Sequence, residues 1–283
     1  MRPGAATTPL VSTELARSLL LVGPLLVYLA LFYAYPLLGM LSQSVHQKVW
    51  TFAAFAELLN SEVFWRVMAI TGRIAVLTTL FCLLLAYPLA FFLSRRSRAT
   101  ANLLLILVLI PFWTSILVRT YAWMVLLGRN GIINNALIAL GLIPRPLTML
   151  NTRFAVYVAM VHVLLPFMVL PLYATFSAMD WRLVQAAQGL GARPLAVFRQ
   201  VLLPLSLPGV SAGCILVFTL AIGFYITPAL VGGPSDVMIS ILISDEVGVL
   251  KWPLAAAMAV VLLAVVLALF AAFSRVVRID KVF

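Results

Sequence analysis

The stretch QAAQGLGARPLAVFRQVLLPLSLPG, residues 185–209, is the longest polar stretch in the second half of a very apolar chain. On each side of Gly191 apolar residues recur at helical spacing, which predicts two short helices joined by a tight turn. The residues with this spacing are Trp181, Val184 and Ala187 or Gln188 before the turn, and Leu195, Phe198, Val201 and Leu202 after it. Because a bare connector needs only a few residues, we expect a helical knob over 181–207 that a partner holds.

Glycine and proline positions define the knob further. Gly189 and Gly191 permit a sharp reversal, because glycine adopts backbone conformations that other residues avoid. Pro194 suits the first turn of the second helix, where its missing N–H leaves no hydrogen bond unmade. Pro204 and Pro208 are expected to end that helix and lead into the next apolar segment.

The chain around the knob has the composition of an integral membrane protein. Of its 283 residues, 64% are hydrophobic and 10% are charged, whereas soluble domains are about half apolar and about a quarter charged. The net charge is +11, but the basic residues are scattered, as expected for residues that flank membrane spans. Membrane lipid is therefore an expected partner, and nucleic acid is not.

Six segments are long and apolar enough to cross a bilayer core of about 30 Å. They lie at roughly 17–41, 68–93, 102–127, 154–176, 208–232 and 254–274. The first is too long for a signal-peptide core and no cleavage site follows it, so it is interpreted as a retained span. The predicted fold is an all-α, polytopic membrane protein with one transmembrane domain over 1–283.

The basic residues between the spans divide unevenly, eleven on one side against six on the other. The three-arginine turn SRRSRAT, residues 94–100, is the clearest marker of the richer side. Because cytoplasmic loops carry the excess of basic residues, both termini and the knob are predicted to be cytoplasmic, with a disordered tail over 1–15. On the other side, 46–66 and 128–152 each suggest a short interfacial helix.

The knob resembles the loop of inner-membrane permease subunits of binding-protein-dependent ABC importers. That family's pattern is Glu-Ala-Ala, three residues, Gly, nine residues, then Ile-x-Leu-Pro. The matching positions here are Gln185, Ala186, Ala187, Gly191, Val201, Leu203 and Pro204. Gln185 replaces a glutamate, which removes a charge but leaves a hydrogen-bonding amide, and Val201 replaces an isoleucine. The resemblance implies a coupling helix that inserts into a groove of a cytoplasmic ATPase; the alternative is a helical hairpin at the membrane interface.

The resemblance extends over nearly the whole chain. PFWTSILVRTYAWMVLLGRNGIIN, residues 111–134, and AGCILVFTLAIGFYITPALVGG, residues 212–233, look like spermidine/putrescine-type permeases. The resemblance implies the type I ABC importer permease fold in a bacterial inner membrane. It also implies a second homologous permease, two copies of an ATPase subunit and an extracytoplasmic solute-binding protein as partners. ATP and Mg would be bound by the ATPase, so no cofactor and no enzymatic activity are expected on this chain.

Charged residues are scarce within the predicted spans. Only Arg73 and Arg119 fall there, and ionisable groups in spans are costly enough to suggest a function. Arg73 can instead extend outward to the interface, and Arg119 either shapes the outer gate or holds backbone carbonyls near Pro111. The carboxylates of Asp245 and Glu246, and of Asp236, lie before the last span, where they either attract a cation to the outer mouth or are ordinary solvated loop residues.

Aromatic rings offer a second means of holding a cation. The candidates in the two family-specific stretches are Trp113, Tyr121, Trp123, Phe224 and Tyr225. Tyr225 and Trp113 are the most favoured of these, although most aromatic residues of membrane proteins serve packing or anchoring at the interface. Four prolines, Pro111, Pro166, Pro171 and Pro228, can break helices beside the path and free backbone carbonyls.

These features favour import of a small organic solute, most plausibly a polyamine such as spermidine or putrescine. An opine, an amino-acid-like compound or a phosphonate is the alternative within the same importer class. A self-contained secondary transporter would need intramembrane acidic residues and paired repeats, which the sequence lacks. A membrane enzyme is disfavoured because the two histidines and two cysteines have no metal-ligand spacing and there is no G-x-x-x-x-G-K phosphate loop.

Overall fold

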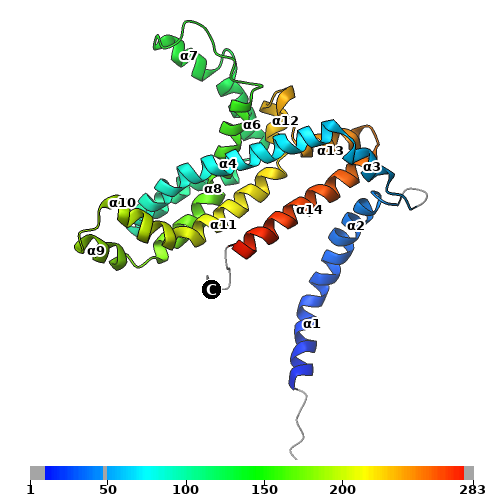
Figure 1. Cartoon of the computed structure of the whole chain (residues 1–283), viewed down its shortest axis with the longest axis horizontal. Helices are drawn as coiled ribbons and strands as arrows, with labels where there is room; N and C mark the ends of the chain where they lie inside the picture. The colour runs from blue at the N-terminus through cyan, green and yellow to red at the C-terminus, as the bar shows by residue number, and fades with distance from the viewer. Residues whose placement is uncertain (1–9, 47–49, 277–283) are drawn as a thin grey trace, which may run out of the picture. The chain divides into compact units, whose positions relative to one another are not determined.

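The computed structural model describes residues 10–46 and 50–276, and each named element in these ranges is a helix (Figure 1). Of the tail expected over 1–15, residues 1–9 lie outside the described residues, and residues 10–15 begin the first helix. The elements are α1 (Leu10–Leu29), the π-helical η1 (Ala30–Ala34), α2 (Tyr35–Ser42), α3 (Ala53–Leu59), α4 (Glu62–Ser94), α5 (Arg98–Trp113), α6 (Ile116–Leu127), α7 (Ile132–Ala139), α8 (Arg153–Ala178), α9 (Arg182–Gly189), α10 (Pro194–Val197), the π-helical η2 (Phe198–Leu202), α11 (Leu203–Ile222), α12 (Ile226–Val231), the 3₁₀ turn η3 (Pro234–Asp236), α13 (Ile239–Gly248) and α14 (Trp252–Val276).

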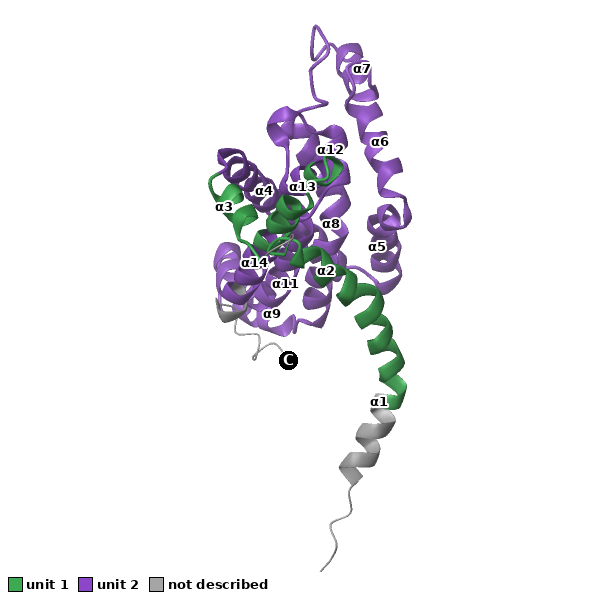
Figure 2. Cartoon of the chain, turned by 90° about the vertical axis from the view of Figure 1, so that its right-hand side faces the viewer, with its two compact units in different colours: residues 1–60, 246–261 green, residues 61–245, 262–283 purple. Residues whose placement is uncertain are grey.

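The chain divides into two compact units, drawn in different colours in Figure 2. Unit 1 comprises 1–60 and 246–261, and unit 2 comprises 61–245 and 262–283. In unit 1, α1, η1 and α2 follow one another as a single helical run, of which Leu20–Ser42 is long and apolar enough to cross a membrane. The cavities and the knob described below all belong to unit 2.

The core of unit 2 is made by α4, α8 and α11, which lie side by side (Figure 1). Ser61 caps α4 by accepting the backbone N–H of Phe64 at 3.3 Å, so one donor at the helix start is satisfied. The closest approach in the core joins α8 and α11 through Gly209 and Gly213. A Cβ at Gly209 would stand 2.5 Å from Thr175 Oγ1, so only glycine lets the two backbones come this near.

The number of apolar crossings agrees with the six predicted spans. Among the described residues, five helices are long and apolar enough to cross a membrane, and a bent pair, α5 with 116–139, makes a sixth if counted as one span. The predicted outer helices also form, as α3 within 46–66 and α7 within 128–152. In Figure 1, α7 projects beyond the end of the three core helices.

The third predicted span, 102–127, is wrong as a single straight helix. The chain bends by 97° between α5 and α6, where Thr114 and Ser115 take extended backbone angles. Pro111 contributes no N–H to the last turn of α5, and the helix ends where the backbone N–H and the hydroxyl of Thr114 both donate to the carbonyl of Pro111, at 3.3 and 2.9 Å. The short polar residues after the proline therefore make the break tolerable within an apolar segment.

The fifth predicted span, 208–232, differs from the structure at both ends. Pro204 and Pro208 do not end the second helix of the knob, because α10, η2 and α11 form one helical run from Pro194 to Ile222. Both prolines lie near the start of α11, and the run breaks instead after Gly223. Beyond the break, the Ser240 hydroxyl satisfies the carbonyl of Phe224 at 2.6 Å, and α12 begins at Ile226.

A π-helical turn explains how the run continues through Pro204. Leu203 N–H donates to the carbonyl of Phe198, five residues back, and the widened turn relieves the contact that a proline ring makes with the preceding helical turn. The same spacing occurs in unit 1, where Tyr35 N–H donates to the carbonyl of Ala30 just before Pro36. Pro166 and Pro171 likewise leave α8 continuous over Arg153–Ala178.

Candidate functional site

The knob reverses direction at Gly191, as its sequence predicts. Gly191 has φ +80°, a region that favours glycine, and its N–H donates to the carbonyl of Gln188 at 3.0 Å. Ala192 N–H donates to the carbonyl of Ala187 at 3.1 Å, which completes the double hydrogen bond of a Schellman helix end. Gly189, in contrast, lies within α9 without a positive φ, so only one of the two glycines makes the reversal.

The outer surface of the knob is apolar at several positions. Of the motif residues, Gln185, Ala186 and Gly191 are exposed, and Ala187 is half-buried. Leu183, Leu190 and Leu195 are also exposed, Leu190 by 89%. The remaining motif residues, Val201, Leu203 and Pro204, lie in η2 and the start of α11 rather than on the knob helices. Exposed leucines beside small residues, outside the spans, are the composition of a protein contact surface.

An aromatic ladder joins the knob to the end of α4, and we define it as Tyr87, Phe91, Phe176, Trp181 and Phe198. Phe91 lies edge-on to Phe176 and Trp181, with ring centroids 5.8 and 5.7 Å apart. Tyr87 contacts Phe176 at 5.2 Å and Phe198 at 6.0 Å in the same manner. The ladder therefore connects both helices of the knob to α4 and to the end of α8.

Tyr87 also makes a polar contact with α11. Its hydroxyl lies 3.0 Å from the hydroxyl of Ser206, a residue that is fully buried in the first turns of α11. Ser206 in turn donates to the carbonyl of Leu203 at 2.9 Å. A displacement of the knob is thus resisted by one hydrogen bond and by the ring contacts together.

The two helix breaks border one cavity of about 200 Å³. Phe112 and Arg119 line it from the two sides of the α5–α6 bend, and Phe224 lines it from the break after α11. Arg119 Nε is buried and has no hydrogen-bond partner among the described residues. α6 and α12 are held together by the hydroxyls of Thr120 and Thr227, 3.1 Å apart. The two family-specific stretches therefore do meet in space, around a charged group.

A second cavity, of about 520 Å³, contains Tyr225 and Asp245 together. The Tyr225 hydroxyl accepts a hydrogen bond from Ser244 at 3.2 Å, and the Asp245 side chain is exposed. The remaining lining comes largely from Asn151 and the loop of 228–234, which includes two glycines and two prolines. An aromatic ring and a carboxylate on one cavity wall can hold a cation by two means at once.

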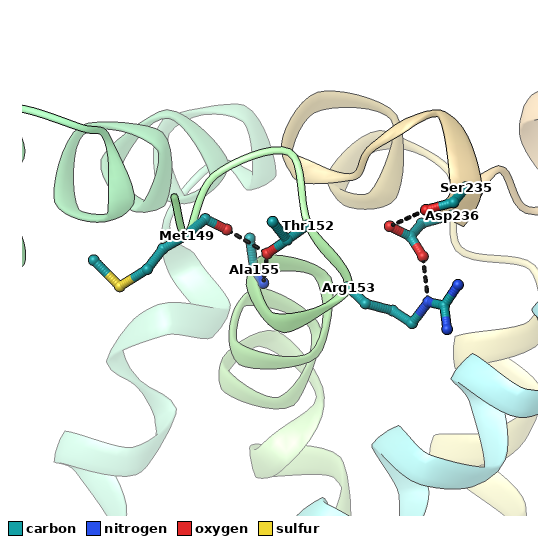
Figure 3. A network of polar contacts seen from close by, with 6 residues as sticks. All are labelled: Met149, Thr152, Arg153, Ala155, Ser235 and Asp236. Carbon is teal, nitrogen blue, oxygen red and sulfur yellow. Dashed lines mark hydrogen bonds and ion pairs between the residues drawn. The ribbon is translucent and has the colours of Figure 1, made fainter. Parts of the chain in front are cut away.

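Asp236 is placed differently from Asp245. Its side chain is buried and accepts a hydrogen bond from Arg153 Nε at 2.6 Å, with Ser235 as a second donor at 3.4 Å (Figure 3). Arg153 stands at the start of α8, next to its cap Thr152, and is 40% exposed. The suggestion that Asp236 attracts a cation at the outer mouth is therefore wrong, because its charge is already paired and out of reach of solvent.

The other path candidates line neither of these two cavities. Trp113 is 75% exposed and Tyr121 is 56% exposed, on α5 and α6. Trp123 donates its Nε1–H to Nδ1 of His162 on α8 at 3.3 Å. Glu246 belongs to unit 1, where its Oε2 lies 3.9 Å from Lys251 Nζ. Within the described residues, no cluster of three or more histidine, cysteine, aspartate or glutamate residues could hold a metal ion.

Apolar spanning helices with two breaks around small cavities, and a helical knob on the end of the core, define a membrane transport subunit. The chain belongs to the family of binding-protein-dependent transport system inner membrane components, whose model matches residues 83–279. It is a permease subunit of an ABC importer rather than an enzyme, and the predicted all-α, six-span fold class is confirmed.

Two curated relatives are similar over most of the chain. The spermidine/putrescine transport system permease protein PotB of Haemophilus influenzae is 37% identical over 233 residues, which are 81% of this chain and 76% of the relative. PotB of Escherichia coli is 36% identical over 215 residues, 76% of this chain and 78% of the relative. Among solved structures, a bacterial alginate ABC transporter in complex with an alginate pentasaccharide-bound periplasmic protein matches with TM-score 0.76 and 20% identity, over 95% of this chain and 98% of that one. At this identity the likeness concerns the fold alone.

Proposed function

We propose that this permease imports a polyamine, such as spermidine or putrescine, and that the solute is held between Tyr225 and Asp245. The observation that carries the proposal is that these two side chains line one cavity beside the break after α11. Both curated relatives are spermidine/putrescine permeases, which supports the solute class. A polyamine is cationic and slender, and it matches an aromatic face and a carboxylate. Arg119 in the neighbouring cavity would repel it, so the solute contact is assigned to Tyr225 and Asp245.

The knob supplies the contact through which ATP hydrolysis drives transport. Its exposed face at Gln185, Ala186, Leu190 and Gly191 docks into a groove of a cytoplasmic ATPase subunit. ATP and Mg are bound and hydrolysed there, and two copies of the ATPase serve the two permeases of the complex. The alternative, a hairpin lying on the bilayer, is less consistent with an exposed Schellman turn that presents leucines away from the core.

The remaining partners follow from the family and from the charge distribution. A second homologous permease completes the pore, and an extracytoplasmic solute-binding protein delivers the polyamine. Both termini and the knob face the cytoplasm, because the basic residues are concentrated on that side. In this orientation α3 and α7 face the outside.

Polyamine uptake into proteoliposomes, with the cognate binding protein supplied, tests the solute and its site. Tyr225→Ala is expected to lower uptake about tenfold, because a cation–π contact in a partly dry cavity contributes about 1–2 kcal/mol. Asp245→Asn should have a milder effect, because water screens an exposed carboxylate.

Tyr121→Ala is the matched control, since Tyr121 is equally large and exposed but lines neither cavity. Uptake by Tyr225→Ala at the level of wild type, with equal expression, would remove Tyr225 from the path. If wild type moves opines, amino acids or phosphonates but no polyamine, the solute class is wrong, and the family assignment stands.

A further inference from the structure

A cavity of about 800 Å³ with polar residues at its mouth lies between the end of α4 and the knob, apart from the two cavities at the helix breaks. Arg95 and Arg96 line it where α4 ends, and Gln185 and Gln188 line it from α9. The wall deeper along α4 is apolar and includes Tyr87 and Phe91.

Both arginines are held by aromatic rings rather than by carboxylates. The Arg95 guanidinium lies over the Trp181 ring at 4.6 Å, and that of Arg96 lies over the Phe92 ring at 4.1 Å. Neither belongs to an ion pair within the described residues. Stacking covers the flat face of a guanidinium and leaves its N–H groups, which point outward in the plane, free to bind an oxyanion. Two unpaired positive charges therefore stand together at the mouth.

The cavity is polar at its mouth and apolar at depth, in the same order in which a bilayer changes from headgroups to acyl chains. α4 has 33 residues and is about 50 Å long, so its ends extend beyond a hydrocarbon core of about 30 Å. A bilayer centred on α4 would place Arg95 and Arg96, which follow its last residue, at the level of the headgroups. Tyr87 lies about 12 Å along α4 toward the bilayer centre. The cavity thus offers cations at the headgroup level and apolar walls at the level of the acyl chains.

From this geometry we infer that the cavity binds an anionic phospholipid. The phosphate is bound by the free N–H groups of Arg95 and Arg96, and the first part of an acyl chain lies along Tyr87 and Phe91. A soluble anion would satisfy the arginines but would leave the apolar wall unfilled, and a zwitterionic lipid brings its own cation to the same mouth. Gln185 is uncharged, so no carboxylate of α9 competes for the arginines.

The test is native mass spectrometry of the complete importer, delipidated and then incubated with phosphatidylglycerol or phosphatidylcholine. Wild type is expected to retain phosphatidylglycerol in preference to phosphatidylcholine. The double variant Arg95→Gln/Arg96→Gln should retain at least fivefold less, and Gln185→Glu should show a similar loss because it adds a competing carboxylate. Arg98→Gln is the matched control, since Arg98 is exposed nearby but does not line the cavity.

Three results would overturn the inference. The first is equal retention of both lipids by wild type, or undiminished retention by the double variant. The second is full displacement of phosphatidylglycerol by millimolar inorganic phosphate, which would make the site one for a soluble anion. The third is binding only after the ATPase subunit has been removed, which would assign the cavity to that subunit. Arg95→Lys/Arg96→Lys, which keeps the charge, should retain more phosphatidylglycerol than the glutamine double variant, and equal ATPase content of the purified complexes shows that both variants fold.

Discussion

At the scale of single residues, Asp236 shows how a charge can be misjudged from its neighbours in sequence. It follows Gly-Gly-Pro-Ser and looks like a solvated loop residue. Its partner Arg153 lies 83 residues earlier, and the local pattern contains no sign of it. Together they join the start of α8 to the loop after α12. The backbone N–H of Asn151 donates to the carbonyl of Val231 at 3.0 Å and strengthens the same junction.

Arg153→Gln is expected to lower the unfolding temperature of the protein, because it leaves a buried carboxylate with one weak donor. Asp236→Asn should cost less, since it removes the charge that needs a partner and leaves Arg153 in contact with solvent. Thermal unfolding in detergent measures both. Two equal effects would contradict the view that the buried carboxylate is the costly member of the pair.

At the scale of elements, the sequence predicted helices well and their breaks poorly. Gly191 was identifiable because a reversal between two helical patterns requires a residue that tolerates positive φ. The effect of the prolines was not identifiable, because a proline in a helix either ends it or is absorbed by a widened turn. Pro204 is absorbed by η2, whereas near Pro111 the polar Thr114 and Ser115 open the chain. Both outcomes use hydrogen bonds close to the proline in sequence, from Leu203 N–H to the carbonyl of Phe198 and from the Thr114 hydroxyl to the carbonyl of Pro111.

The aromatic ladder makes a prediction at this scale. Tyr87→Leu should remove the ring contacts of α4 with Phe176 and with Phe198 of the knob, while keeping an apolar residue and leaving the contact of Phe91 with Trp181. We expect the polyamine moved per ATP hydrolysed to fall several-fold, because the knob then moves α4 less effectively. Tyr87→Phe keeps the rings and loses only the contact with Ser206, so its effect should be smaller.

Uptake and ATP hydrolysis are measured together in proteoliposomes, and their ratio is the result that matters. A purely structural role for Tyr87 would lower both rates in proportion and leave the ratio unchanged. That outcome would show that the ladder only packs the helices.

At the scale of the whole molecule, hydropathy was sufficient to identify an integral membrane protein with five or six crossings among the described residues, whereas the permease family was identified from the motif of the knob and the two family-specific stretches. These sequence features could not indicate which candidate path residues share a cavity, because that depends on the two breaks bringing α6 and α12 together. Tyr225 and Asp245 share a cavity because α13 lies beside the break before α12, where the Ser244 hydroxyl donates to Tyr225, whereas Trp113 and Tyr121 lie on the surface of the chain. The orientation still rests on charge alone, and it has a direct test.

Cysteines introduced at Ala139 and Ala99 test which side of the membrane each of these two segments faces. Both residues are exposed, Ala139 at the end of α7 and Ala99 at the start of α5. In a background with Cys82 and Cys214 replaced by alanine, an impermeant maleimide added to intact cells should label Ala139→Cys and miss Ala99→Cys. The reverse pattern would put the knob outside and exclude its contact with a cytoplasmic ATPase.

One unbroken helical run, from Pro194 to Ile222, connects the knob to the break at Gly223. Its 29 residues span about 43 Å, so a tilt of about 5° at the knob displaces the far end by about 4 Å. That far end is the break at Gly223 and Phe224, directly beside Tyr225. With the proposed ATPase contact and solute site, a small angular movement of the knob becomes a shift as wide as an aliphatic chain beside Tyr225. A helix that ended at Pro204 would lose this amplification.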